Sequence, residues 1–296
     1  MPGTQQEFTT LFENPANVLL KEGKTEEALR VATTALAAAR QAAEDDASKV
    51  PALITALEML GDVHREMNEI DRAEKRYREA IDLLSKADVR VAVRAKLRSR
   101  LATLLDFNGR EAESVALYEQ AIDDYEAMTP PDEDVAAQLR NNLAMIYKGL
   151  GKFALSEQHY LRGLEILEEK HGHESEFTAT LFNNLGSLYY SAGFPEQGRE
   201  VLAEALDIRT RLLGPDHPDV AQTHANLGSI CHELGDSAEA LDHYEQGLAI
   251  LEKHIKDKAA SYEAVGLDYI ALLESMQEDK RASAFGKRMQ RVLQTA

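Results

Sequence analysis

The chain repeats one pattern of small, large and aliphatic positions at a nearly constant long interval. In each interval a small residue is followed four positions later by a large one, seven positions later by another small one, and eight positions later by an aliphatic one. The first small residues are Ala73, Ser114, Ser156, Gly198, Ala240 and Ala282, spaced 41 or 42 positions apart. Offsets of 0, 4, 7 and 8 lie on one face of an α-helix. The pattern therefore predicts a helix in every repeat that approaches its neighbour closely over the small residues.

The large residue of the pattern fills the space beside the small ones. These residues are Tyr77, Tyr118, Tyr160, Leu202 and Tyr244, and the pattern fails at Gly286. A leucine followed by a small residue precedes each such helix, at Leu60-Gly61, Leu101-Ala102, Leu143-Ala144, Leu185-Gly186 and Leu227-Gly228. Eight positions after each leucine lies a residue suited to the positive φ that ends a helix, namely Asn68, Gly109, Gly151, Gly193 and Gly235. Each repeat is thus expected to be two helices joined by a short turn.

Units that recur at a fixed long period stack on one another, so the fold class predicted is an all-α solenoid of helix pairs. We expect one domain over residues 1–296, with a degenerate repeat at 1–50, five full repeats at 51–256 and a capping helix pair at 257–296. The second helices are predicted at 72–84, 111–125, 154–169, 195–212 and 237–254, and the final pair at 261–276 and 280–293. This gives roughly fourteen helices.

The repeat positions resemble the tetratricopeptide repeat, whose usual period is about 34 residues. The period here is longer than that. Residues 213–221, which read Leu-Gly-Pro-Asp-His-Pro-Asp-Val-Ala, resemble the inter-repeat loop of kinesin light chains. The Asn-Asn-Leu sequences that end at Leu143 and Leu185 are similar to the same family, and residues 225–227 echo them. The resemblance implies a right-handed superhelix whose concave groove is lined by the first helix of each pair.

One departure from the family changes the expected partner. Kinesin light chains begin with a long heptad segment that docks on the motor chain, whereas the first helical repeat here begins by about Asn14. The layout resembles that of the bacterial kinesin light chains, which are associated with bacterial tubulins. The resemblance therefore implies an adaptor that binds a protein or peptide, or a bacterial tubulin-like filament.

Polar residues at groove positions are the candidate partner-binding set. Asparagine is a poor interior helix residue, so its recurrence indicates a role beyond helix formation. A side-chain amide donates and accepts, which suits the backbone of an extended peptide. Hydrogen bonding between repeats, which fixes the superhelical pitch, is the alternative, and it applies best to the asparagines beside the packing leucine. The candidates are Lys96, Arg100, Asn141, Asn142, Lys148, Asn183, Asn184, Tyr190, Asn226 and His232.

Two basic clusters interrupt an otherwise acidic chain. Arg90, Arg94 and Arg98 share a predicted helix with Lys96 and Arg100, and bidentate arginine contacts suit an acidic ligand. A solvated face that balances acidic neighbours is the alternative. The second cluster, on the terminal helix, is Lys280, Arg281, Lys287, Arg288 and Arg291, interleaved with apolar residues. Such a mixture suits an anionic membrane surface, although a solubilising cap has the same pattern.

Composition narrows the remaining function classes. The net charge of −18 argues against nucleic-acid binding, which requires a basic face. No glycine-rich phosphate loop, HExxH or Cys-x-x-Cys sequence is present, so we expect neither an enzyme nor a small-molecule substrate, cofactor or metal site. Cys231 lies where other repeats have tyrosine, which indicates a core thiol. A single cysteine and an N-terminus without a signal peptide suggest a cytoplasmic protein, associated with a filament or membrane.

Overall fold

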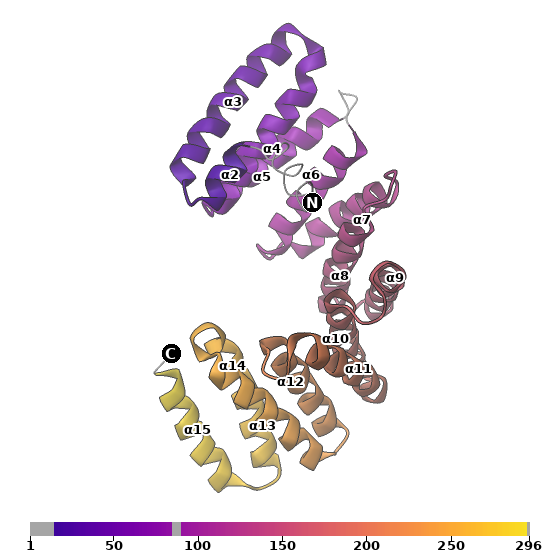
Figure 1. Ribbon diagram of the computed structural model, residues 1–296, viewed down its shortest axis with the longest axis vertical. Helices are drawn as coiled ribbons and strands as arrows, with labels where there is room; N and C mark the ends of the chain where they lie inside the picture. The colour runs from indigo at the N-terminus through magenta and orange to yellow at the C-terminus, as the bar shows by residue number, and fades with distance from the viewer. Residues whose placement is uncertain (1–14, 85–89, 295–296) are drawn as a thin grey trace, which may run out of the picture. The chain divides into compact units, whose positions relative to one another are not determined.

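The computed structural model describes residues 15–84 and 90–294 (Figure 1). Over these residues the chain forms fourteen α-helices, one short 3-10 helix and no strand, which confirms the all-α prediction. The helices are α2 (Pro15–Lys21), α3 (Thr25–Asp45), η1 (Ala47–Lys49), α4 (Val50–Glu66), α5 (Ile70–Leu83), α6 (Val91–Asp106), α7 (Glu111–Glu126), α8 (Glu133–Gly149), α9 (Phe153–His171), α10 (Glu176–Ser191), α11 (Pro195–Leu213), α12 (Pro218–Glu233), α13 (Ser237–Lys253), α14 (Ile255–Ser275) and α15 (Asp279–Leu293).

The chain divides into two compact units, residues 1–139 and 140–296, with the division inside α8. In each unit the helices follow one another as antiparallel pairs, the even-numbered helix first (Figure 1). The prediction of a single domain stays a prediction. The pair α2 and α3 occupies the expected degenerate repeat, and its small residues Ala28 and Ala32 are fully buried. A solenoid of helix pairs is therefore confirmed.

Small and large residues meet inside each repeat as the sequence pattern predicts. A Cβ added to Gly61 on α4 would lie 2.6 Å from the Tyr77 ring on α5. A Cβ at Gly228 on α12 would lie 2.9 Å from the Tyr244 ring on α13, and Tyr77 and Tyr244 are both almost fully buried. The glycines therefore let the second helix approach closely enough for a tyrosine to cover the first.

The predicted turns fall where helices end. Asn68 has a φ of 58°, and Gly109, Gly151, Gly193 and Gly235 also have positive φ. The capping pair uses Gln277 at the same place, with a φ of 62°. The left-handed backbone reverses the chain between the two helices of a repeat.

The start of the capping pair differs from the prediction. Helix α14 begins at Ile255, six residues before the expected start at 261, and it contains non-helical backbone at Lys258. Residues 254–260 lack the glycine and prolines that break the chain at 213–218. Without those residues the helix continues through a kink, so the long inter-repeat loop is absent here. None of the helices in the described ranges combines the length and apolar character needed to cross a bilayer.

Candidate functional site: the first-helix face

Side-chain amides connect the first helices of the second unit. Asn184 on α10 donates from Nδ2 to Oδ1 of Asn141 on α8, at 2.8 Å. One repeat later, Asn226 on α12 donates to Oδ1 of Asn183 at 3.1 Å. Longer contacts of 3.3 and 3.4 Å join Asn141 to Asn142 and Asn183 to Asn184. The five asparagines singled out from the sequence therefore form one hydrogen-bonded series, which we name the asparagine ladder.

Burial distinguishes the members of the ladder. Asn183 is 2% exposed, and its Oδ1 also accepts from the Thr223 hydroxyl at 3.2 Å. Asn141, Asn142, Asn184 and Asn226 are partly exposed. The structure thus buries Asn183 between repeats and leaves the other four amides partly accessible at the edge of the ladder. Peptide binding by all five residues remains a prediction.

A pocket of about 490 Å³ lies beside the ladder and is lined by α8, α9, α10 and α12. Its lining combines the apolar side chain of Met145 with Lys148, Asn184, Ser187 and Asn226. Lys148 donates from Nζ to the Ser187 hydroxyl at 2.6 Å, and burial lowers its pKa. No carboxylate in the described ranges lies within ion-pair distance of Lys148. We name this site the Lys148 pocket.

Tyr190 and His232 lie outside the Lys148 pocket. Tyr190 is 37% exposed near the end of α10, and His232 is partly exposed in the last turn of α12. Burial raises the pKa of the Tyr190 hydroxyl, with further contributions from Glu233 and Asp268. The sequence pattern places all these residues on one face, but of them the structure gathers only Asn183, Asn184, Asn226 and Lys148 around one cavity.

In the first unit, the predicted groove cations are paired with acids from the neighbouring repeat. Lys96 and Arg100 on α6 contact the Glu58 carboxylate at 2.7 and 3.2 Å, and Arg100 also pairs with Asp62. Glu58 and Asp62, on α4, are 7% and 2% exposed. Burial raises the pKa of Asp62, while the charge of Arg100 and the hydroxyl of Tyr77 oppose that shift.

The remaining arginines of α6 converge on a single buried acid. Asp124 on α7 is 5% exposed. Arg94 contacts its Oδ1 at 2.6 Å and Arg98 contacts its Oδ2 at 2.5 Å, while Arg90 is exposed just before α6. Sequence reasoning missed Glu58, Asp62 and Asp124. The spacing gave a signal for Glu58 alone, which precedes Arg100 by one repeat length. An acidic ligand at α6 therefore has to compete with buried internal carboxylates.

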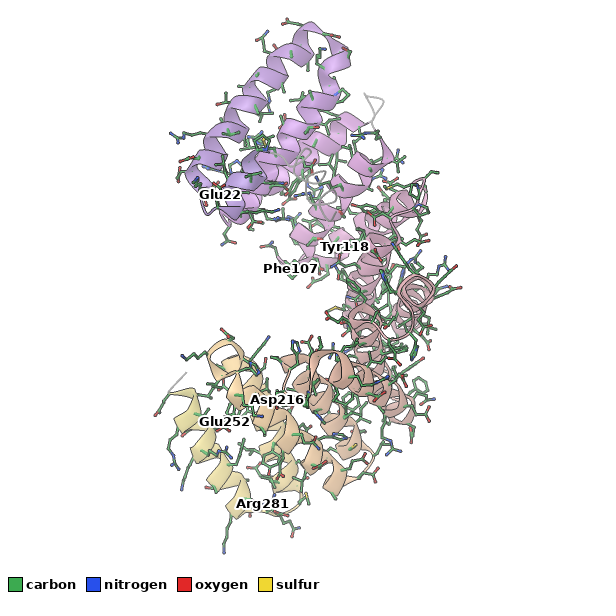
Figure 2. The ribbon with its side chains drawn as sticks, viewed as in Figure 1. Glu22, Phe107, Tyr118, Asp216, Glu252 and Arg281 are labelled. Atoms are coloured by element: carbon green, nitrogen blue, oxygen red, sulfur yellow. The ribbon has the colours of Figure 1, made fainter. Side chains whose placement is uncertain are left out.

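The terminal basic cluster lies on α15 at the surface of the second unit. Arg281, labelled in Figure 2, contacts Glu278 at 2.5 Å and Glu245 at 3.2 Å, and Arg288 contacts Glu252 at 2.6 Å. Lys280, Lys287 and Arg291 are exposed. The interleaved apolar residues pack into the core of this unit, and they are Phe285, Met289, Val292 and Leu293. The apolar half of α15 is therefore committed to packing rather than facing outward.

Cys231 is fully buried, as its place in the repeat predicts. Burial, followed by the nearby Glu239, raises the pKa of its thiol to about 11. Without a bound metal ion, the Cys231 thiol is therefore protonated at neutral pH and unsuited to nucleophilic attack.

Stacked helix pairs with a polar first-helix face define the class of protein as a helical-repeat scaffold. The family model described as tetratricopeptide repeat matches residues 8–86, 135–196 and 177–253. The chain belongs to the tetratricopeptide-repeat family. No curated protein matches the chain at a significant level.

Solved structures place the chain among kinesin-light-chain-like repeats. BtubC (BKLC) from P. vanneervenii is 31% identical, with a TM-score of 0.62 over 76% of this chain and 90% of that one. Repeats from a Podospora anserina protein described as a kinesin light chain are 18% identical, with a TM-score of 0.59 over 70% and 98%. Apo RapI is 13% identical, with a TM-score of 0.61 over 82% and 99%. The last two show the fold alone, whereas the first confirms the predicted kinesin-light-chain resemblance.

Proposed function

We propose that the protein is a non-enzymatic adaptor that holds an extended, acidic protein segment on the first-helix face of its second unit. The observation that carries this proposal is the Lys148 pocket. Lys148 is a partly buried cation with no counter-ion among the described residues, next to amides that donate and accept. Burial removes part of the hydration that stabilises the Lys148 ammonium. A carboxylate that enters the pocket would offset this loss by its opposite charge.

The surroundings of Lys148 suit a peptide better than a small molecule. The pocket is open to solvent, and Met145, which is 54% exposed, supplies an apolar surface beside the lysine. The accessible amides of Asn141 and Asn184 lie one repeat apart, so together they suit successive groups of an extended backbone. We place the partner's acidic side chain at Lys148 and its main chain along the ladder.

The resemblance to bacterial kinesin light chains supports a bacterial tubulin-like filament as the source of that segment. Tetratricopeptide repeats present extended binding surfaces, and a repeat protein of this size offers one without a catalytic cleft. The charge of −18 implies that the contact depends on a local cation and not on overall attraction to an acidic partner.

Co-sedimentation with assembled bacterial tubulin filaments tests the proposal. The wild-type protein is compared with Lys148→Gln and with Lys152→Gln, which removes a nearby exposed lysine that faces the Tyr147 ring. We expect the wild-type and Lys152→Gln proteins to pellet, and Lys148→Gln to lose most of its binding. Pelleting should weaken with added salt because the contact is electrostatic.

One outcome would reject the binding site, and another would reject the partner. If the wild-type protein pellets and Lys148→Gln pellets equally well, the Lys148 pocket is not the binding site. If folded wild-type protein stays in the supernatant at low salt, the tubulin-like partner is excluded.

A further inference from the structure

Three metal-binding side chains of different chemistry converge between α12 and α13. They are Cys231 on α12, and Glu239 and His243 one helical turn apart on α13. One ligand atom from each lies within 4.8 Å of the others. We propose that Cys231, Glu239 and His243 form a Zn²⁺ site that links the two helices of this repeat.

The separations are close to those of a bound ion. Zinc binds thiolate sulfur at about 2.3 Å and imidazole nitrogen or carboxylate oxygen at about 2.0–2.2 Å, so tetrahedral ligand atoms lie about 3.5 Å apart. His243 Nε2 is 3.8 Å from Glu239 Oε1. The Glu239 side chain is 51% exposed and can rotate the short remaining distance, while Cys231 and His243 are held by packing. Three protein ligands with solvent access on the Glu239 side leave a fourth position for water.

A fourth residue orients the histidine ligand. Nδ1 of His243 lies 2.9 Å from Nδ1 of His224, which is 7% exposed on α12. When His243 donates from Nδ1, its Nε2, which lies 3.8 Å from Glu239 Oε1, is unprotonated and can bind a metal. Histidines that bind zinc commonly donate their other ring N–H to a hydrogen-bond acceptor, which fixes the tautomer and the ring position. His224 therefore acts as a positioning residue for the proposed ligand.

Negative charge surrounds the proposed site. Asp242 on α13 and Asp236 just before it add negative charge next to His243 and Cys231. The opposing cation is Arg199 on α11, but its nearer partner is Asp236 at 2.9 Å, and Glu239 is 4.0 Å away.

The neighbouring repeats show that this combination is particular to one repeat. Positions equivalent to Cys231, Glu239 and His243 hold Tyr189, Gln197 and Val201 one repeat earlier. Two repeats earlier they hold Tyr147, Leu155 and His159. Packing of the helix pair alone therefore requires neither the thiol nor the carboxylate. The three residues occur together in this repeat, whereas Glu113, at the position equivalent to Glu239 three repeats earlier, is followed by Leu117 in place of the histidine.

Cobalt(II) titration of the purified full-length chain tests the proposal. Cobalt takes the same tetrahedral ligands as zinc and gives a sulfur-to-metal charge-transfer absorption when a thiolate binds. We expect this absorption with one equivalent of Co²⁺ and its loss on adding Zn²⁺. Cys231→Ala, Glu239→Gln and His243→Gln should each weaken Co²⁺ binding at least about 100-fold, and His224→Gln about 10–100-fold.

The control is His173→Gln. His173 lies between Glu168 and Glu204 at 2.7 and 2.9 Å but has no cysteine neighbour, so its loss should leave the titration unchanged. Glu239→Gln keeps the test decisive if Cys231→Ala perturbs folding, because Glu239 is at the surface. No charge-transfer absorption in the folded wild-type protein, or an absorption that survives Glu239→Gln undiminished, overturns the proposal.

Discussion

The Nδ2 of Asn184 lies 2.8 Å from the Oδ1 of Asn141, 43 positions earlier in the chain. One amide of each repeat thus donates to an amide of the preceding repeat, and the same relation joins Asn226 to Asn183. The contact between repeats is therefore specific as well as apolar, because each amide has a partner only when neighbouring first helices keep this register.

Asn183→Ala should destabilise the second unit. It removes the acceptor of Asn226 Nδ2 and one of the two acceptors near the buried Thr223 hydroxyl, which also lies 3.1 Å from the Asp219 carbonyl, and the loss of such hydrogen bonds costs about 0.5–1.5 kcal/mol each. Urea unfolding followed by circular dichroism measures the loss. Asn141→Ala, at a partly exposed position, should cost less and act mainly on partner binding. Equal stability of the Asn183→Ala and wild-type proteins would contradict the structural role.

Gly61→Ala should lower the stability of the first unit. The new methyl would lie 2.6 Å from the Tyr77 ring, and overpacking of this kind costs about 1–3 kcal/mol. The matched control is Gly149→Ala near the end of α8, where no atom lies within 4 Å of the added Cβ. Thermal unfolding should show a lower Tm only for Gly61→Ala. A similar Tm for both variants would mean that close helix approach is not required.

Asp124→Asn should cost about 2 kcal/mol of unfolding free energy, because the buried acceptor of two arginines loses its charge. The comparison is Glu174→Gln, which removes an exposed partner of Arg211 and should cost less than about 1 kcal/mol. Denaturant titration of both variants measures the difference. A loss at Asp124 no greater than that at Glu174 would show that the α6 arginines do not depend on this acid.

Stability should fall as the pH drops from about 6.5 towards about 4 in metal-free protein. The folded state holds the pKa of His224 at about 4, below the ordinary 6.5, so the unfolded chain binds a proton first in that window. His243 shifts in the same direction, and Asp242 opposes the shift in both. His224→Gln should flatten the dependence of Tm on pH across this window. An unchanged slope in that variant would assign the pH dependence to other groups.

The sequence predicted the packing of the repeats better than their polar contacts. Tyr77 and Gly61 were identifiable because a fixed spacing on a helix dictates which residues face a neighbour. The burial of Glu58 and Asp62 was not identifiable, because charged residues in a helix are normally exposed, and only the approach of α6 buries these two.

The remaining differences also depend on contacts between helices. The convergence of Cys231 and His243 depends on the register of α12 against α13, which the one-dimensional pattern leaves open. The early start of α14 followed from the missing loop residues.

Photo-crosslinking to tubulin-like filaments tests the central claim most directly. A benzophenone amino acid is placed at Met145 on the first-helix face or at Leu161 on α9, two positions that are 54% and 47% exposed. The account predicts a crosslinked adduct from position 145 that an excess of unlabelled protein suppresses, and little or none from position 161. Efficient crosslinking from position 161 with none from position 145 would contradict binding on the first-helix face.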